Sequence, residues 1–374
     1  MTKLIWLIAG AAFAASMAPA QEGPEQILQR AVKLHQSGDP EKAIPLYRQF
    51  LQVQPQAAQI RSNLGAALAS TGRYDEAITE YRQALKSLPG DPSIRLNLSL
   101  SLYKSGQISE AAKELASLHI SQPNNRQVTQ LLADCWLRQG QNTKVIELLT
   151  PVEAADRTDL AVAYMLGTAL LQEKNLEKGQ QIIDQILRNG DSAEARFLMA
   201  TAKLNGMDFN GAIADLEKAV ALNPNLPDVN YYLGVAHKEV GDQAAARKDF
   251  EKELLQNPND FGSNLNLALM LKEDSDFAGA RRLLDRALRV RPGDPGALYQ
   301  LAAIDLSTGK TEEARVKLET ILKDSPQFIE AHISLATVYY RLKRKEDGDR
   351  EKALVQQLNA EKDAREAREK DKEK

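Results

Sequence analysis

Residues Ala58–Asp91 read AQIRSNLGAALASTGRYDEAITEYRQALKSLPGD, and this stretch decides the fold. Its first half carries apolar residues at helical spacing, and a second apolar stripe of the same kind follows the turn at residues 71–73. Pro89 ends the second stripe, because proline disfavours continuation of a helix and restricts the residue before it. The stretch therefore predicts two short helices joined by a turn.

Prolines recur along the chain with the same spacing. Within each of two series the step is 34 residues, and the gap between the series corresponds to three repeats, one of them shortened by a residue. The prolines are Pro55, Pro89, Pro123, Pro224, Pro258, Pro292 and Pro326. Small residues keep the same period at Ala43, Ala77, Ala111, Ala212, Ala246, Ala280 and Ala314. This period indicates one solenoid of stacked helix–turn–helix units rather than separate globular domains.

The period and the residues that carry it resemble the tetratricopeptide repeat (TPR) family. In the quoted stretch these residues are Leu64, Gly65, Leu68, Ala77, Tyr81, Ala84 and Pro89. The resemblance implies an all-α fold, namely a TPR solenoid in which helix–turn–helix repeats form a right-handed superhelix. In that family the first helices of the repeats line a concave groove.

The predicted TPR array covers residues 21–346, with about nine to ten repeats. The fourth and fifth repeats depart from the pattern, since Arg157 stands where proline is expected and Gly179 stands at the alanine position. The seventh repeat starts at Pro227. Residues 347–374 are predicted to form a capping helix and a charged tail, because a terminal repeat needs a polar outer face.

Residues Met1–Ala20 are predicted to be a secretory signal peptide. Lys3 supplies a positive start, Leu4–Ala15 is an uncharged run too short to favour a membrane-spanning helix, and Ala18-Pro19-Ala20 matches a small-x-small cleavage site. The alternative is an uncleaved N-terminal anchor. We expect an exported bacterial protein, periplasmic or secreted, with no membrane insertion after cleavage, as in the exported bacterial TPR proteins that it resembles.

Composition and motifs argue against several classes of function. The formal net charge of −3 implies no general attraction to nucleic acid. Cys135 is the only cysteine, so neither an intramolecular disulfide nor a cysteine-based zinc site can form. The four histidines lack metal-ligand spacing, and neither a serine elbow nor a helical His-Glu-x-x-His motif occurs. We therefore predict no catalytic residue, metal or cofactor, and a protein that is not an enzyme.

The candidate binding surface is a row of side chains at the fifth position of each first helix. This position lies off the stripe that faces the partner helix, and its aromatic residues concentrate from the fifth repeat onward. Exposed apolar rows mark partner surfaces, and aromatic side chains are favoured anchors. The predicted anchors are Tyr164, Phe197, Tyr231, Leu265, Tyr299 and Ile333. The alternative is that these side chains pack against the neighbouring repeat.

The sixth position adds primary amides at Asn63, Asn97 and Asn266. A primary amide can both donate to and accept from a peptide backbone. The row resembles the asparagine ladder of the O-linked N-acetylglucosamine transferase family, although Tyr232 is among the residues that interrupt it.

The predicted function is a non-enzymatic scaffold that binds an extended peptide, or a segment of a partner protein, in the concave groove. One alternative is a targeting or accessory subunit for a separately encoded envelope enzyme. A self-associating scaffold for envelope assembly is the other, and the oligomeric state stays open at this point.

Overall fold

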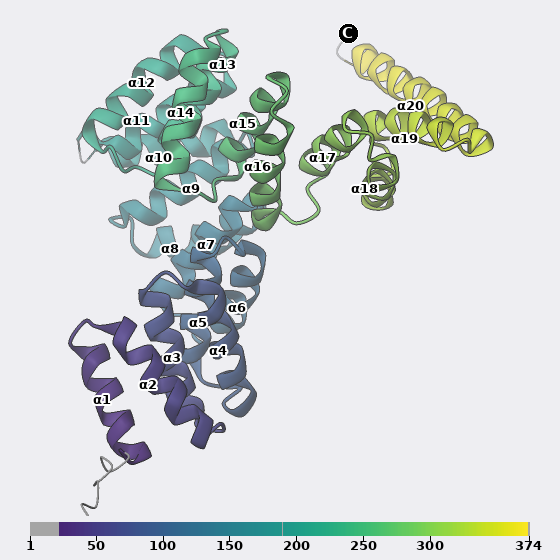
Figure 1. Cartoon of the computed structure of the whole chain (residues 1–374). Helices are drawn as coiled ribbons and strands as arrows, with labels where there is room; N and C mark the ends of the chain where they lie inside the picture. The colour runs from purple at the N-terminus through teal and green to yellow at the C-terminus, as the bar shows by residue number, and fades with distance from the viewer. Residues whose placement is uncertain (1–21, 189, 373–374) are drawn as a thin grey trace, which may run out of the picture. The chain divides into compact units, whose positions relative to one another are not determined.

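The computed structural model describes residues 22–188 and 190–372, and within them twenty α-helices and no strand are present (Figure 1). The helices are α1 Pro24–Gln36, α2 Pro40–Val53, α3 Ala58–Ser70, α4 Tyr74–Ser87, α5 Pro92–Lys104, α6 Ile108–Ser121, α7 Arg126–Arg138, α8 Asn142–Ala155, α9 Leu160–Gln172, α10 Leu176–Leu187, α11 Ala193–Asn205, α12 Phe209–Leu222, α13 Val229–Glu239, α14 Gln243–Gln256, α15 Phe261–Glu273, α16 Phe277–Val290, α17 Pro295–Ser307, α18 Thr311–Asp324, α19 Ile329–Arg341 and α20 Lys345–Lys372. The predicted signal peptide, residues 1–20, lies outside the described residues.

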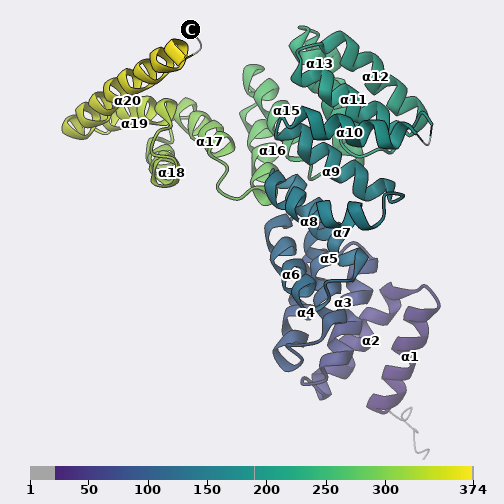
Figure 2. The same cartoon turned by 180° about the vertical axis from the view of Figure 1, so that it is seen from behind.

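The chain divides into two compact units, residues 1–94 and residues 95–374. Within the first unit α1 packs against α2 and α3 packs against α4. Within the second unit each first helix likewise packs against its second helix, for example α15 against α16, as Figure 1 and Figure 2 show from opposite sides. The predicted all-α fold of paired repeat helices is confirmed.

The repeating prolines lie just beyond the ends of second helices. Helix α4 ends at Ser87, two residues before Pro89, and α14 ends at Gln256, two residues before Pro258. Because proline has no N–H and clashes with the preceding turn of a helix, it stops these second helices at the same place. The prolines thus fix the start of the connection to the next repeat.

The turn inside each repeat contains one residue with a left-handed backbone. These residues are Gly38, Gly72, Gly106, Gly140, Lys174, Met207, Gly241, Ser275, Gly309 and Lys343. They are 34 residues apart except for the step from residue 174 to residue 207, which is one residue shorter. Helix α10 has 12 residues, whereas α8 and α12 have 14 each, and the connection from α10 to α11 is one residue longer than that from α8 to α9, so the missing residue belongs to the segment where α10 ends.

The small residues of the repeat lie where two helices cross. A Cβ atom on Gly65 would lie 2.9 Å from the ring of Tyr81, and one on Gly234 would lie 2.6 Å from the ring of Phe250. Ala77, on the second helix of the same repeat as Gly65, is fully buried. Since protein interiors are close-packed, a larger side chain at these crossings would separate the helices.

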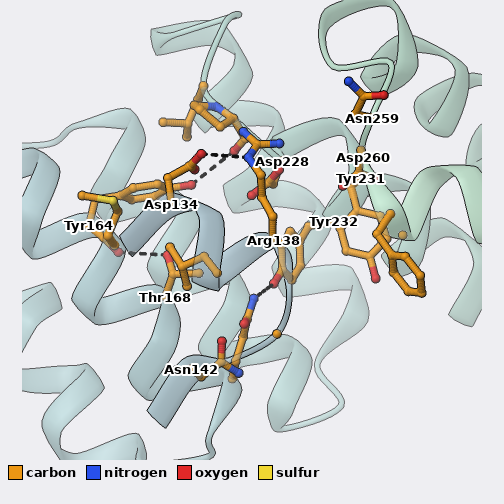
Figure 3. Close-up of a pocket in the computed structure, with 18 of the residues that line it drawn as sticks. Asp134, Arg138, Asn142, Tyr164, Thr168, Asp228, Tyr231, Tyr232, Asn259 and Asp260 are labelled. Atoms are coloured by element: carbon orange, nitrogen blue, oxygen red, sulfur yellow. Dashed lines mark hydrogen bonds and ion pairs between the residues drawn. The ribbon is translucent and has the colours of Figure 1, made fainter. Parts of the chain in front are cut away.

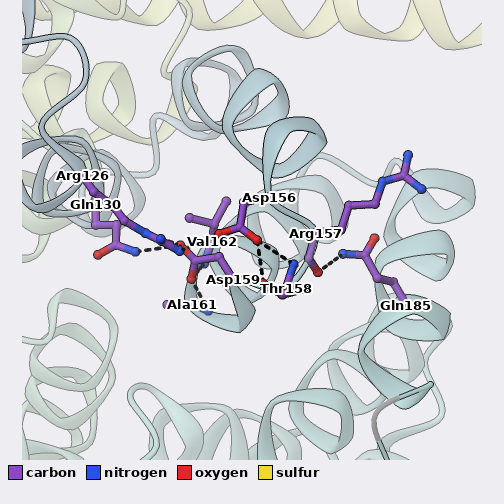
Figure 4. A network of polar contacts seen from close by, with 9 residues as sticks. All are labelled: Arg126, Gln130, Asp156, Arg157, Thr158, Asp159, Ala161, Val162 and Gln185. Carbon is purple, nitrogen blue, oxygen red and sulfur yellow. Dashed lines mark hydrogen bonds and ion pairs between the residues drawn. The ribbon is translucent and has the colours of Figure 1, made fainter.

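The connection from α8 to α9 has Arg157 in place of the repeating proline, and polar contacts hold it instead (Figure 4). The Asp159 carboxylate caps α9 by accepting hydrogen bonds of 3.1 and 3.2 Å from two backbone N–H groups in its first turn. From α7, Gln130 Nε2 and Arg126 Nε donate to the same carboxylate at 3.1 and 2.8 Å. These contacts fix the start of α9, which carries Tyr164.

Helix α20 packs against α19 as the second helix of the last repeat. Gly348 is buried, and a Cβ atom there would lie 2.6 Å from the ring of Tyr340. His332 Nδ1 lies 2.5 Å from the Glu351 carboxylate, which joins the two helices. Leu354, one turn further on, is 41% exposed. Among the described residues no helix has the length and apolar character needed to cross a membrane.

Candidate functional site

The second unit contains a cavity of about 690 Å³ whose walls come mainly from the first helices α7, α9, α13 and α15. The turns around residues 223–228 and 259–262, together with Arg291, line another part of it. Since the walls are first helices, the cavity lies on the face that the family resemblance assigns to the groove. Its volume falls within the roughly 300–1,000 Å³ of typical ligand sites.

Three tyrosines line the cavity. The Tyr164 hydroxyl on α9 donates a hydrogen bond of 3.2 Å to the Pro227 carbonyl oxygen. Tyr231 and Tyr232 are neighbours on α13, with ring centroids 5.1 Å apart. Gln172 at the end of α9 donates a 2.7 Å hydrogen bond to the Tyr232 hydroxyl. These bonds connect the fifth repeat to the seventh, so that the rings are held before any ligand arrives (Figure 3).

Phe197, a predicted anchor, lies in the core behind the tyrosines. Its side chain is 0% exposed, and its ring centroid is 5.3 Å from that of Tyr164 and 5.0 Å from that of Tyr232. Helix α11 stacks between α9 and α13, and the tyrosines of those two helices cover its fifth position. A partner in the cavity meets the tyrosines, whereas Phe197 supports them from behind.

Leu265 and Asn266, also predicted site residues, lie on α15 and line the cavity together with Tyr164 and Tyr231. The Asn266 amide is engaged within the chain, since its Nδ2 donates to the Gly262 carbonyl at 3.0 Å and its Oδ1 accepts from Lys238 Nζ at 3.0 Å. To grip a peptide backbone, this amide would have to exchange one of these bonds.

The remaining predicted residues do not line this cavity. Tyr299 is half-buried, with its ring centroid 5.5 Å from that of Phe328, and Ile333 is 51% exposed. Asn63 and Asn97 are half-buried, in the first and second unit respectively. The structure thus gathers Tyr164, Tyr231, Leu265 and Asn266 at one site and leaves the others elsewhere.

Two arginines join distant repeats at the cavity. Arg138 Nε, at the end of α7, donates to the Asp134 carboxylate at 2.8 Å, and its guanidinium lies 5.2 Å from the centroid of the Tyr103 ring. The Arg138 carbonyl oxygen accepts a 2.8 Å hydrogen bond from Arg291 Nε, which is 153 residues away in the sequence. This contact ties the turn after α16 to the end of α7.

Burial raises the pKa of two carboxyl groups that line the cavity, Asp228 and Asp260, and of Glu253 outside its lining. Burial raises the pKa of Asp228 to about 7, although the positive charge of nearby Arg138 acts in the opposite direction. On α14, burial raises the pKa of Glu253 to about 8, and the charges of Asp228 and Asp260 add to this effect. Burial also raises the pKa of Asp260, which caps α15 by accepting a 2.6 Å hydrogen bond from the Ser263 N–H. For these buried carboxyl groups, the positive charges of nearby arginines therefore do not outweigh the effect of burial.

Sequence reasoning missed several residues of the site, above all Tyr232, Arg138 and Asp228. In the sequence Tyr232 only interrupts the row of amides at position 6, yet in the structure it forms part of the wall. The seventh repeat starts at Pro227 by its period, but α13 begins at Val229 because Asp228 has a left-handed backbone, with a φ of 63°. Proline at a helix start is an ordinary signal, so this local departure has no signature in the repeat pattern.

No group of three or more His, Cys, Asp and Glu side chains suited to a metal ion occurs in the part of the chain that the structure describes. Three family models of this repeat type match the sequence. One described as tetratricopeptide repeat matches residues 28–92, and another with the same description matches residues 68–135, 137–204 and 271–332, which is more than half of the chain. A third, described as TPR repeat, matches residues 208–241.

Among solved structures, the APC/C hetero-tetramer Cut9-Hcn1 is similar, with a TM-score of 0.57 and 12% identity over 90% of this chain and 81% of that chain. MamA from Desulfovibrio magneticus RS-1 has a TM-score of 0.42 and 21% identity, over 46% of this chain and 98% of that chain. No curated protein matches the sequence. At such identities the likeness to Cut9-Hcn1 concerns the fold alone.

Proposed function

The chain belongs to the tetratricopeptide repeat family, and we propose that it binds an extended peptide segment of a partner protein in the cavity formed by α7, α9, α13 and α15. Proteins of this family are typically non-catalytic scaffolds that mediate protein–protein interactions. The observation that carries the proposal is the convergence of Tyr164, Tyr231, Tyr232 and Leu265 on one cavity. Tyrosine anchors combine large apolar faces with a polar tip, which suits the side chains and backbone of a peptide.

The tyrosines are ordered in advance. Two of the three hydroxyl groups are hydrogen-bonded across repeats, and Phe197 packs against Tyr164 and Tyr232 from behind. Since ordering a side chain on binding costs roughly 0.5–1.5 kcal/mol, fixed rings favour binding. The cavity volume of about 690 Å³ suits a few residues of an extended segment rather than a folded domain.

The test compares two tyrosines at the same position of their repeats. Peptides are first selected on the wild-type protein from a random displayed library, and their dissociation constants are measured by calorimetry. We expect Tyr231→Ala to weaken binding by roughly tenfold or more, as for a buried aromatic anchor, and Tyr299→Ala to leave it nearly unchanged. If Tyr231→Ala binds as well as wild type while its circular dichroism is unaltered, or if no peptide is enriched, the proposal is wrong.

We further propose that the protein acts after export from a bacterial cell. The proposal rests on the charged start, short apolar run and cleavage motif within Met1–Ala20, residues that lie outside the described structure. N-terminal sequencing of the protein from the periplasmic fraction or the medium should read Gln21 first. A protein that stays in the cytoplasm with Met1 intact would contradict it.

A further inference from the structure

We propose that the cavity recognises a cationic side chain of the bound peptide, lysine or arginine, between Asp228 and Glu194 and beside the ring of Tyr164. The inference rests on the proposed peptide binding and adds the chemistry of the ligand. Among the described residues, three observations support it: two carboxylates without partners, arginines that make no hydrogen bond to either carboxylate, and a left-handed backbone that aims one carboxylate away from its helix.

Asp228 and Glu194 line the cavity, and in the part of the chain that the structure describes neither carboxylate makes a hydrogen bond or an ion pair. Both residues are partly buried. Carboxylates withdrawn from water are normally paired, because an unpaired charge loses hydration without compensation. A cation brought by a ligand would supply this compensation.

The two arginines of the cavity do not meet this need. Arg138 directs its Nε to Asp134 at 2.8 Å, and Arg291 Nε donates to the Arg138 carbonyl oxygen. The charge of Arg138 does act on Asp228, but the effect of burial is larger, and the pKa of Asp228 stays raised at about 7. The lining therefore favours an additional positive charge and disfavours a negative one.

An aromatic ring, that of Tyr164, lines the same cavity as these carboxylates. The Tyr164 hydroxyl donates to the carbonyl oxygen of Pro227, the residue directly before Asp228. Burial raises the pKa of Tyr164, and the charges of Asp228 and Glu194 raise it further, which places both carboxylates within electrostatic reach of the phenol. The face of an aromatic ring attracts cations, so Tyr164 and the carboxylates favour the same kind of ligand. Figure 3 labels Tyr164 and Asp228 in the lining of the cavity.

The backbone of Asp228 holds its carboxylate away from the helix that it precedes. Asp228 is the N-cap residue of α13, but its φ is 63° and its side chain caps no N–H group. Most aspartates at other N-caps accept such bonds, namely Asp159, Asp208, Asp242, Asp260, Asp276 and Asp294, whereas Asp39 does not. A strained residue released from its usual structural role is typical of a binding site.

The experiment uses peptides selected on the full-length wild-type protein, with acetylated N-termini. Each selected lysine or arginine is compared with a neutral replacement, N-acetyl-lysine for lysine and citrulline for arginine. We expect wild type to prefer the cationic peptide by roughly tenfold or more, and Asp228→Asn and Glu194→Gln each to reduce this preference to about threefold or less. Asparagine tolerates a left-handed backbone, so Asp228→Asn removes the charge and keeps the turn.

The matched control is Glu330→Gln. Glu330 is the second residue of α19, as Glu194 is the second residue of α11, but it is exposed and lies outside the cavity. We expect this variant to keep the wild-type preference. Selected peptides that share no lysine or arginine, or whose affinity does not change on neutralisation, would overturn the cationic ligand and leave peptide binding intact. Failure to enrich any peptide would overturn both proposals.

Discussion

Tyr231 and Tyr299 stand at the same position of the first helix in the seventh and ninth repeats, but their surroundings differ. Tyr231 packs beside Tyr232, with ring centroids 5.1 Å apart, and lines the cavity. The Tyr299 ring packs on Phe328, with centroids 5.5 Å apart, and its hydroxyl lies 3.3 Å from that of Ser334. The same residue type at the same repeat position therefore lines a cavity at Tyr231 but packs against neighbouring side chains at Tyr299.

The start of the following repeat explains the difference. Gly262 lies so close to Tyr231 that a Cβ atom would be 2.2 Å from the ring. Two repeats later Glu330 takes the place of Gly262, and Phe328 takes the place of Asp260. A polar cap and a glycine leave the first tyrosine in contact with the cavity, whereas Phe328 packs on the second. A groove position therefore acquires its role from the repeat that follows it.

The largest expected effect is a difference in stability loss between two residues of the fifth-position row. Phe197 supports the cavity from the core, whereas Ile333 is exposed. Phe197→Ala should lower the free energy of unfolding by about 3–5 kcal/mol, because it leaves a void among packed aromatic rings. Ile333→Ala, at a side chain that is 51% exposed, should cost less than about 1 kcal/mol. Urea unfolding followed by circular dichroism measures both values. Equal losses in the two variants would contradict the placement of Phe197 in the core.

The second effect depends on pH and concerns Glu253 behind the cavity. The folded-state pKa of about 8 lies above the unfolded value of 4.5, so the folded state binds this proton more tightly. The resulting stability is present below the unfolded pKa and is lost as pH rises towards 8. We expect Glu253→Gln, which stays neutral, to be more stable than wild type at pH 9 by on the order of 2 kcal/mol, with the gain vanishing near pH 4. Thermal unfolding across this range measures it.

Asp305 in α17 provides the matched control from the other region. Burial would raise its pKa, but hydrogen bonds from Lys317, at 2.7 Å, and from Arg281 outweigh burial and lower the pKa. Its stabilising effect is therefore present above its ordinary pKa of 3.8 and is lost below it. Asp305→Asn should make the folded protein less stable at pH 7, whereas Glu253→Gln should make it more stable. The same sign for both variants would mean that the carboxyl groups of the two regions do not differ in this way.

The fold could be predicted from the sequence because its determinants are local and repeated. Pro89 and its counterparts end helices, and Gly65 and Ala77 allow helices to cross closely. The same residue types at the same positions therefore produce the same packing along the array. The cavity depends on contacts that do not repeat. The bond between Arg291 and Arg138 joins residues 153 positions apart, and the left-handed backbone of Asp228 occurs at no other N-cap for which a backbone conformation is described. The register of the fifth positions singles out Tyr231, which lines the cavity. It could not show that neighbouring tyrosines cover Phe197.

The third effect tests the glycine that accompanies Tyr231. Gly262→Ala should lower the free energy of unfolding by about 1 kcal/mol, because displacing the Tyr231 ring costs more than the better helix propensity of alanine contributes. It should also weaken peptide binding. Gly296→Ala, at the same position of the ninth repeat, meets only the Asp294 side chain at 3.3 Å and should be neutral or slightly stabilising. Thermal unfolding and peptide calorimetry on both variants provide the measurement. Equal behaviour would show that Tyr231 moves freely.

The smallest effect concerns the turns, which also differ between regions. The first four left-handed turn positions are glycines, whereas Met207 occupies the sixth and is 78% exposed. Replacing Met207 by glycine removes the strain of a left-handed backbone, which should stabilise the folded state by roughly 1–2 kcal/mol. Glycine also has more conformational freedom in the unfolded chain, and this cancels about 0.4–1 kcal/mol of the gain. Met207→Gly should therefore stabilise by about 0.5 kcal/mol, while Gly72→Ala, at the second turn, should destabilise. Because the Met207 side chain packs on little, a loss of stability in Met207→Gly would show that the turn is not strained.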